Sequence, residues 1–263
     1  MKRSVFVAVP CYTGQIEITT ANSIMRARDE AAAMGWGCAV EFQPLNCYLP
    51  LVRNILVAKF IKSGMTDLVF WDGDIAAAPG GFARLLSHRV DVVAAAYRWR
   101  KDPEGYALQS AKPITLSSVG EDGLIQLDGV PAGFLRITRA AVDRMTAHFP
   151  DLWATDQHHE EPFPWLFDCE FGPEHRYHGE DFVFCRRFRE AGGKVYVDPH
   201  IPIFHTGPKT FYGKFVNYLR RDAAARTPAS ELDAARERLA EKMRALDWAW
   251  PAERGSRRNK INH

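Results

Sequence analysis

The sequence lacks the features that stabilise a secreted scaffold or place a chain in a membrane. Its five cysteines are odd in number and form no CxxC pair, which argues against a disulfide framework and a zinc ribbon and favours a reducing compartment. No apolar run approaches the roughly 20 residues of a membrane-spanning helix. Residues 1–3 resemble the start of a signal peptide, but the apolar stretch that follows is short and contains Pro10. We therefore expect a cytoplasmic protein without a transmembrane segment.

An excess of charge of one sign is also missing. With 34 Lys and Arg against 32 Asp and Glu, the net charge is +2, which is too small to indicate nucleic-acid binding by itself. The sequence contains no internal repeat and no low-complexity segment. A hydrophobic content of 46% and a charged content of 25% are typical of a globular protein, and 263 residues suffice for one large α/β domain, or one and a half.

What is present is an alternation of strands and helices. Continuous apolar runs within 4–10 and 67–74 are typical of buried strands. Helical segments are expected between them, over about 16–34 and over 51–64. This alternation predicts an α/β fold, in which a Rossmann-like, mostly parallel sheet is flanked by helices.

The pattern changes in the second half of the chain. Short strands around the turn GEDG are expected over 105–128, and an irregular loop over 150–178. Helices are expected over Lys209–Arg221 and over about Ser230–Leu246. The chain is thus expected to have three parts: a main domain, a C-terminal helical extension and a disordered basic tail, over residues 1–208, 209–250 and 251–263.

Two aspartates, Asp72 and Asp74, end the apolar run LVFW. In an extended segment, residues two apart point to the same side, and open α/β sheets bind ligands at the carboxyl ends of their strands. Two carboxylates there suit Mg²⁺ or Mn²⁺, which take oxygen ligands and substrate phosphates. An aspartate-glycine turn that holds no ligand is the alternative, and this triplet alone does not decide between the two.

Two later segments carry related residue types. In HGEDFVF, Glu180 and Asp181 begin a helix, where the macrodipole favours ionised carboxylates and leaves one available as a base. An ordinary acidic helix start is the alternative. His205 follows a strand-like segment and precedes Lys209, so the histidine fits a cation site and the lysine fits a phosphate. A histidine of the core or of a loop is the alternative for His205.

In this order, a strand ending in DxD, a GED helix and a strand with a trailing HxG resemble the GT-A glycosyltransferases, and most closely their family-2-like group. The likeness covers about Ser4 to Lys209. It includes VAVPCYTG, which resembles the first strand and donor turn, and VRNILVAKFIKSGMTDLVFWDGDI, which resembles the helix and strand before the metal motif. The segment GVPAGFLRITRAAVDRM resembles the strand and loop beside the acceptor. The resemblance implies a GT-A fold with a nucleotide-sugar-binding half over 1–100 and an acceptor and catalytic half over 101–208.

The resemblance also implies roles for the matching acidic and histidine residues. Asp74, Asp72 and His205 would bind a divalent cation, Mn²⁺ or Mg²⁺, and Asp72 would alternatively contact the donor ribose. Asp181 would deprotonate the acceptor hydroxyl, with Glu180 orienting it or the acceptor.

Donor and acceptor contacts follow from the same resemblance. Pro10, Tyr12 and Arg53 would border the nucleotide of a nucleotide-sugar donor, with a UDP-sugar favoured, and Lys209 would steady its diphosphate. The aspartate that such enzymes often carry after the second strand is absent near EFQPLNC. The acceptor would be a glycan, a lipid-linked sugar or a hydroxylated DNA base. The expected acceptor contacts are Arg98, Trp99, Arg100 and Gly133.

The chemistry of these residue types favours the same activity. Breaking a sugar–phosphate bond builds negative charge on the leaving diphosphate, which a bound cation stabilises. One carboxylate base with no evident nucleophile favours a single displacement with inversion. We therefore predict a metal-dependent glycosyltransferase. One alternative is a nucleotidyltransferase, which should carry a Gly-rich loop with Lys or Arg after the first strand, unlike PCYTGQIE. The other is a non-catalytic nucleotide-sugar or glycan binder, which has no need of a base.

Overall fold

A computed structural model describes residues 2–44, 46–156, 159–172, 175–207, 209–226, 237–238 and 241. Contacts divide the chain into two compact units, Met1–Arg220 and Arg221–His263, and each is treated by itself. The helix predicted over 230–246 lies almost wholly outside the described residues, and the basic tail lies wholly outside them. None of the helices in the described part of the chain has the length and apolar character needed to cross a bilayer.

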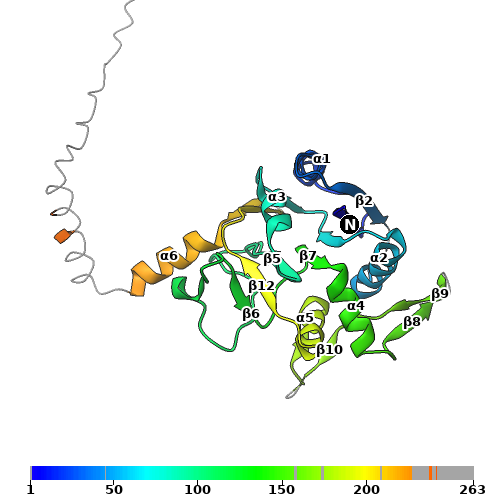
Figure 1. The fold of residues 1–263 in the computed structure, drawn as a ribbon. Coiled ribbons are helices and arrows are strands. Elements are labelled where there is room, and N and C mark those ends of the chain that lie inside the picture. The colour runs from blue at the N-terminus through cyan, green and yellow to red at the C-terminus, as the bar shows by residue number, and fades with distance from the viewer. Residues whose placement is uncertain are drawn as a thin grey trace, which may run out of the picture. The chain divides into compact units, whose positions relative to one another are not determined.

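The first unit is built on a seven-stranded sheet with the order β2-β1-β3-β7-β5-β12-β6 (Figure 1). The strands β2, β1, β3, β5 and β12 run in one direction, whereas β7 and β6 run antiparallel to their neighbours. The prediction of a mostly parallel α/β sheet flanked by helices is confirmed, and the arrangement is consistent with a Rossmann-like GT-A fold. The strand bounds are β1 Ser4–Cys11, β2 Gly37–Pro44, β3 Asp67–Trp71, β5 Val92–Ala95, β6 Ile125–Leu127, β7 Phe134–Thr138 and β12 Val195–Asp198.

Helices cover both faces of this sheet because successive strand residues point to opposite sides. Phe6 and Phe70 pack on the face covered by α2, α4 and α5, whereas Val7 and Trp71 pack on the face covered by α1 and α3 (Figure 1). Fully burying one such apolar side chain stabilises the fold by about 1.5–3 kcal/mol. The helix bounds are α1 Ile18–Ala33, α2 Leu49–Ser63, α3 Gly81–Ser87, α4 Arg139–His148 and α5 Glu180–Glu190.

A smaller sheet brings two distant sequence motifs together. Strand β13 (Ile203–Thr206) pairs antiparallel with β4 (Ile75–Ala77) on one side and with β14 (Thr210–Gly213) on the other. In this register His205 lies opposite Ile75, and the Thr206 N–H donates to the Asp74 carbonyl at 2.8 Å. The DxD segment and the HxG segment are therefore neighbours in space.

Three predictions of local structure are wrong. Lys209–Arg221 is not one helix, because β14 pairs with β13 before α6 (Phe215–Arg226) begins, and this pairing overrides the helical spacing of the aromatic residues. Segment 105–128 has the predicted turn at GEDG, where the Gly123 N–H donates to the Gly120 carbonyl at 2.9 Å, but it contains only one strand, β6, and a 3₁₀ turn at Leu116–Ser118. The expected loop over 150–178 contains two hairpins, formed by β8 (Trp153–Asp156) with β9 (His159–Pro164) and by β10 (Glu170–Phe171) with β11 (Tyr177–His178).

Candidate functional site

The DxD segment forms a turn at the carboxyl-terminal edge of the large sheet. Strand β3 ends at Trp71, and the Asp72 carbonyl accepts from the Ile75 N–H at 3.1 Å, which closes a β-turn. The Asp72 N–H donates to the Gly133 carbonyl at 2.9 Å. The turn that was the alternative interpretation is therefore present, and the extended geometry expected for the two aspartates is wrong. A turn of this kind does not exclude a bound cation.

The two carboxylates of the turn have different partners. Asp72 Oδ1 accepts from Arg53 Nη2 at 3.1 Å, whereas Asp74 Oδ2 accepts from Arg100 Nη1 at 2.9 Å. Arg53 comes from α2, and Arg100 comes from the loop after β5. Burial raises the pKa of Asp72, and the charge of Arg53 opposes that rise. Each carboxylate is thus neutralised by its own guanidinium, which offsets the repulsion between the two aspartates.

Arg53 joins the DxD turn to the start of α5. Its side chain is only 2% exposed, and its Nε donates to Glu180 Oε1 at 3.2 Å while Nη2 holds Asp72. Its guanidinium lies 5.1 Å from the centre of the Phe70 ring. Burial lowers the pKa of Arg53, but Asp72 and Glu180 outweigh this effect and raise it overall. Arg53 was expected beside the nucleotide, and the structure places it against these carboxylates.

Asp181 is a half-buried carboxyl group in the first turn of α5. Burial raises the pKa of Asp181 to about 7, and the negative charge of Glu180 adds to the rise. Arg53 opposes this rise, as does the Phe182 N–H, which donates to Asp181 Oδ1 at 2.8 Å. The helix start was expected to keep this carboxyl ionised, but burial outweighs the macrodipole. A carboxyl group with a pKa near 7 exchanges protons at neutral pH, as a general base must.

Gly133 lies where a side chain has no room. A Cβ at this position would be 2.8 Å from Asp72 Oδ2 and 2.8 Å from the Tyr97 hydroxyl oxygen. Burial raises the pKa of Tyr97 well above its usual value, so the hydroxyl remains protonated. Gly133 was expected beside the acceptor, and the structure places it against the DxD turn.

His205 faces Asp74 across the small sheet. Its Nδ1 lies 2.9 Å from the Arg98 carbonyl, which can only accept, so Nδ1 carries the proton. Its Nε2 lies 3.5 Å from Asp74 Oδ2. Burial raises the pKa of Asp74, but His205 and Arg100 outweigh it and hold this pKa below its usual value. When the ring is neutral, Nε2 therefore presents a lone pair toward the Asp74 carboxylate.

These groups fit a divalent cation. Asp74 offers a carboxylate oxygen, and His205 offers Nε2 while its other ring nitrogen is fixed by a carbonyl, as metal-binding histidines usually are. Carboxylate and imidazole ligands together suit Mn²⁺. Within the described residues, no cluster of three or more His, Cys, Asp or Glu side chains is placed to hold a metal. Water and phosphate oxygens would have to complete the coordination, because Asp72 is bound to Arg53.

A cavity of about 690 Å³ opens beside Asp72 and Asp74, and we call it the donor cavity after the role that the sequence analysis expected of its residues. Pro10 and Tyr12, both expected at the nucleotide, line it, and so does Arg100. Its walls also include four polar residues that the sequence analysis did not single out, namely Gln15, Glu17, Asn46 and Cys47. These residues follow β1 and β2, and their position at the carboxyl ends of parallel strands is the signal that would have found them.

The remaining predicted contacts form a charged network in the loop after β5. Lys209 Nζ, expected at the diphosphate, donates to Asp102 at 2.9 Å, and Arg98 Nη2 binds the same carboxylate at 2.7 Å. Trp99 is exposed, and the Lys101 ammonium lies 4.3 Å from the centre of its ring. The network fixes the loop whose Arg98 carbonyl holds His205.

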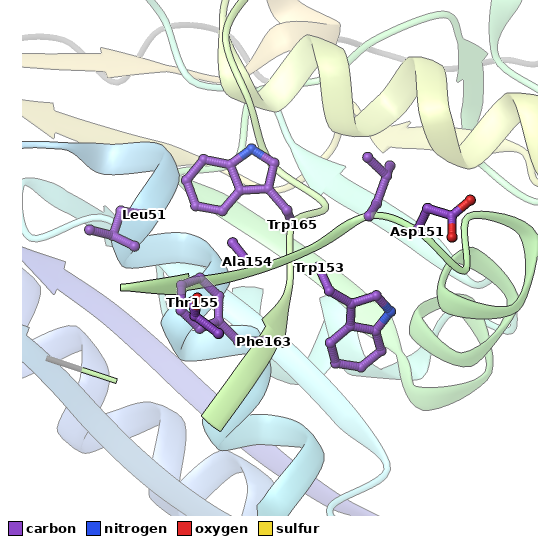
Figure 2. A pocket seen from close by; sticks show the side chains of 8 residues that line it. Leu51, Asp151, Trp153, Ala154, Thr155, Phe163 and Trp165 are labelled. Carbon is purple, nitrogen blue, oxygen red and sulfur yellow. The ribbon is translucent and has the colours of Figure 1, made fainter. Parts of the chain in front are cut away.

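A second cavity of about 370 Å³, which we call the tryptophan cavity, lies between α2 and the β8–β9 hairpin. Figure 2 shows Trp165, Phe163 and Trp153 around it, with Leu51 contributed by α2 and Asp151 at one end. The rings supply flat apolar surfaces, and the Asp151 carboxylate supplies a hydrogen-bond acceptor. The region 150–178 thus contains a preformed pocket that the sequence did not predict.

The tryptophan cavity and the donor cavity are neighbours. Tyr48 lies in the sequence between Cys47 and Leu49, which both line the donor cavity, and its ring centre is 6.4 Å from that of Trp165. Asn54 on α2 fixes the segment after β9. Its Nδ2 donates to the Phe167 carbonyl at 2.8 Å, and its Oδ1 accepts from the Leu166 and Phe167 N–H groups at 2.8 and 2.9 Å.

The solved structures that resemble the chain include three of low sequence identity. A197 from STIV is 15% identical with a TM-score of 0.45, and the likeness covers 78% of this chain and 86% of that one. A glycosyltransferase involved in the glycosylation of the major capsid of PBCV-1 is 10% identical with a TM-score of 0.33, over 57% of this chain and 66% of that one. A nucleoside-diphosphate-sugar pyrophosphorylase from Vibrio cholerae RC9 is 9% identical with a TM-score of 0.37, over 82% and 99%. No family model and no curated protein matches the sequence. At these values the likenesses define neither a family nor an activity.

Proposed function

We propose that this protein is a metal-dependent glycosyltransferase that moves a sugar from a nucleotide diphosphosugar, with a UDP-sugar favoured, to an acceptor hydroxyl. One observation carries the proposal. Asp181, with a pKa of about 7, is half-buried beside Glu180, and Arg53 joins Glu180 to the turn that borders the donor cavity. Sugar transfer to a hydroxyl requires a base that titrates near neutral pH, and Glu180 and Arg53 link Asp181 to Asp72 in the wall of a cavity with a candidate cation site.

The donor cavity suits a nucleotide diphosphate. Asp74 and His205 would hold a divalent cation, Mn²⁺ or Mg²⁺, which when bound stabilises the negative charge that develops on the leaving diphosphate. Tyr12 lines the cavity with 66% of its surface exposed, so its ring is available to stack on the nucleotide base. Arg53 opposes the rise that burial causes in the pKa of Asp72, and it holds this carboxyl group at the cavity wall.

Asp181 accepts the proton of the acceptor hydroxyl as the hydroxyl oxygen attacks the anomeric carbon. The bond between that carbon and the phosphate oxygen breaks, its electron pair leaves with the diphosphate, and the proton remains on Asp181. Glu180 assists through its charge, because that charge keeps the pKa of Asp181 high enough for it to hold the proton. A base on the face opposite the leaving group gives a product with inverted configuration.

The tryptophan cavity supports a saccharide acceptor. Sugar rings pack their apolar faces on aromatic side chains, and Trp153 and Trp165 provide two such surfaces. Asp151 at the edge of this cavity would accept hydrogen bonds from sugar hydroxyls, whereas it would repel the phosphates of DNA. We therefore favour a glycan or a lipid-linked sugar over a hydroxylated DNA base as the acceptor.

Nucleotidyl transfer fits this site less well. It calls for a Gly-rich loop with a lysine or arginine after the first strand, whereas residues 10–17 contain one glycine, Gly14, and no lysine or arginine. A non-catalytic binder has no need of the base that we assign to Asp181. Both alternatives are separated from glycosyl transfer by the products of the reaction.

Release of nucleotide diphosphate from a panel of nucleotide sugars, with Mn²⁺ present, tests the proposal. We expect turnover of at least one donor and a loss of about 10²- to 10⁴-fold in Asp181→Asn. Glu190→Gln is the matched control, because Glu190 ends the same helix and pairs only with Arg186 among the contacts described for it. If no donor is bound or turned over, the proposal is wrong.

Two further measurements separate the parts of the mechanism. Asp74→Ala should lose Mn²⁺ affinity together with turnover, and full activity in this variant would rule out the cation site. Product configuration, assigned by NMR at the anomeric carbon, should be inverted relative to the donor. Parallel incubation with glycans and with hydroxylated-base DNA then identifies the acceptor class.

A further inference from the structure

Arg100 binds the aspartate that we assign to the cation site. We propose that Arg100 occupies Asp74 in the donor-free protein and transfers to the donor diphosphate when a divalent cation takes Asp74. This inference rests on the proposed function, and it assigns to Arg100 two successive partners in one site. The sequence analysis had expected Arg100 at the acceptor.

The guanidinium and a cation would use the same oxygen. Arg100 Nη1 lies 2.9 Å from Asp74 Oδ2, and this is also the oxygen that His205 Nε2 approaches at 3.5 Å. An ion bound between Asp74 and His205 would therefore lie close to the positive charge of Arg100. Two positive charges at this distance repel each other, so binding of one favours departure of the other.

Apart from its ion pair with Asp74, the Arg100 side chain has few polar contacts in the described structure. Its side chain is 48% exposed, and its other hydrogen bond in the described structure runs from the same Nη1 to the Thr206 carbonyl at 3.3 Å. Arg98, in the same loop, is 14% exposed and binds both Asp102 and the Lys101 carbonyl. An ion pair as exposed as that of Arg100 is weak, so a divalent cation can displace it.

The backbone around Arg100 is fixed, so the exchange requires only a side-chain rotation. The Trp99 N–H donates to the Gly105 carbonyl at 2.9 Å, and the Arg98 carbonyl accepts from His205. Arg100 packs its aliphatic part on Gly207, where a Cβ would lie 2.8 Å from Arg100 Cδ. The glycine of the HxG segment thus leaves a path for this side chain along the site.

The second partner follows from the place and shape of the guanidinium. Arg100 lines the donor cavity together with Asp74, so a guanidinium released from Asp74 remains at the cavity wall. Its planar fork of donors matches phosphate oxygens, which it binds in pairs. A diphosphate that binds together with the cation offers such oxygens next to the Arg100 guanidinium, which has then lost its contact with the Asp74 carboxylate.

Two binding measurements on Arg100→Gln test the exchange. Titration with Mn²⁺ alone, followed by the loss of the free-ion EPR signal, should show an affinity about 2- to 5-fold higher than in the wild type, because the competing cation is gone. Titration with UDP at saturating Mn²⁺, followed by calorimetry, should show an affinity at least about 10-fold lower, because the diphosphate loses its arginine. Neither measurement depends on turnover.

Lys101→Gln is the matched control, since Lys101 belongs to the same loop but lies on Trp99. It removes the same charge and should leave both affinities unchanged. Arg100→Lys should keep the weak competition with Mn²⁺ and lose most of the UDP affinity, because an ammonium lacks the planar fork.

The outcomes separate this inference from the proposed function. Opposite shifts of the two affinities in Arg100→Gln support the exchange. Unchanged affinities, or a fall in Mn²⁺ affinity, overturn it while leaving glycosyl transfer intact. Donor turnover without any divalent cation, lost in Arg100→Gln, overturns it as well, because Arg100 would then replace the metal. If the wild type binds neither Mn²⁺ nor any nucleotide sugar, both the exchange and the proposed function are wrong.

Discussion

Arg53 Nε donates to Glu180 Oε1 at 3.2 Å, and this contact ties the helix next to the DxD turn to the helix that carries Asp181. The two residues are far apart in the sequence, and they meet because α2 and α5 cover the same face of the sheet. Arg53 also holds Asp72. Asp72 and Glu180 therefore share one buried guanidinium.

Arg53→Met should destabilise the protein by about 3–5 kcal/mol, because it leaves buried carboxylates without their partner. Arg53→Lys keeps the charge but cannot bridge Asp72 and Glu180, so we expect a smaller loss of stability and a large loss of turnover. Urea unfolding and donor turnover measure the two effects. The charge of Arg53 lowers the pKa of Asp181, so Arg53→Met should also move the acid limb of the pH–activity profile upward. A limb that stays in place would show that the arginine has only a structural role.

The rate of sugar transfer should rise with pH through about 7 and then level off. Asp181 must lose its proton to act as a base, and burial holds the pKa of Asp181 at about 7. The measurement is kcat/KM against pH between about 5 and 9. Glu180→Gln removes the charge that raises the pKa of Asp181, so the rise should begin at lower pH in this variant. A flat profile in the wild type would contradict the assignment of the base.

The same carboxyl group should make folding stability depend on pH. The pKa of Asp181 is about 7 in the folded protein against an ordinary value of 3.8, so the folded state holds the proton more tightly. Its contribution to stability is present at low pH and is lost as the pH rises to about 7. Asp181→Asn escapes this loss, so its stability relative to the wild type should increase by about 4 kcal/mol between pH 4 and pH 8. Chemical unfolding at the two pH values measures the difference, and a constant difference would contradict the raised pKa.

Gly133→Ala should lower the stability of the site. The added Cβ meets both Asp72 Oδ2 and the Tyr97 hydroxyl at 2.8 Å, which forces one of them to move. We expect a loss of about 1–3 kcal/mol in thermal or urea unfolding. The Tyr97 ring carbon Cε1 would also lie 2.8 Å from this Cβ, so Tyr97→Phe in the same chain, which removes only the hydroxyl, should recover little of the loss. Gly37→Ala is the control, because its Cβ would meet only Ser4 Cβ, at an ordinary 3.5 Å.

Trp153→Ala should weaken acceptor binding without affecting the donor. Loss of one sugar-packing surface is expected to raise the acceptor KM by about 10-fold, while the rate of donor hydrolysis in water stays the same. Phe42→Ala is the control, because Phe42 and Trp153 are both 45% exposed but Phe42 lies on the edge strand β2. An equal effect of the two substitutions would show that the tryptophan cavity does not receive the acceptor.

The parallel part of the fold could be predicted because its strands are buried on both faces. Residues 5–10 and 68–71 are continuous apolar runs, and such runs followed by helices have few other ways to pack. The insertion of β7 between β3 and β5 could not be predicted. The apolar sequence of β7 fits any central position in the sheet. Which strands it pairs with depends on long-range contacts, and these leave no pattern in the local sequence. For the same reason the strand β14 was taken for part of a helix.

The sequence analysis proposed which residues belong to the candidate site, but it did not predict the contacts between them. Asp74, His205 and Asp181 were chosen from motif order, and that these residues act as assigned stays a prediction. The ion pair of Arg100 with Asp74 has no signal in the sequence, because an arginine in a polar loop shows no periodicity. The raised pKa of Asp181 was also missed, since the burial that causes it depends on the packing of α5 against the sheet.

The register in which β13 pairs with β4 decides whether His205 faces Asp74. Side chains alternate along a strand, so a slip of β13 by one residue against β4 would turn His205 away and bring a neighbour of different chemistry to face Asp74. A slip in either direction would have this effect, with both residues still present in the sequence. A relative that keeps both motifs but pairs these strands in another register would therefore keep the fold and lose this arrangement.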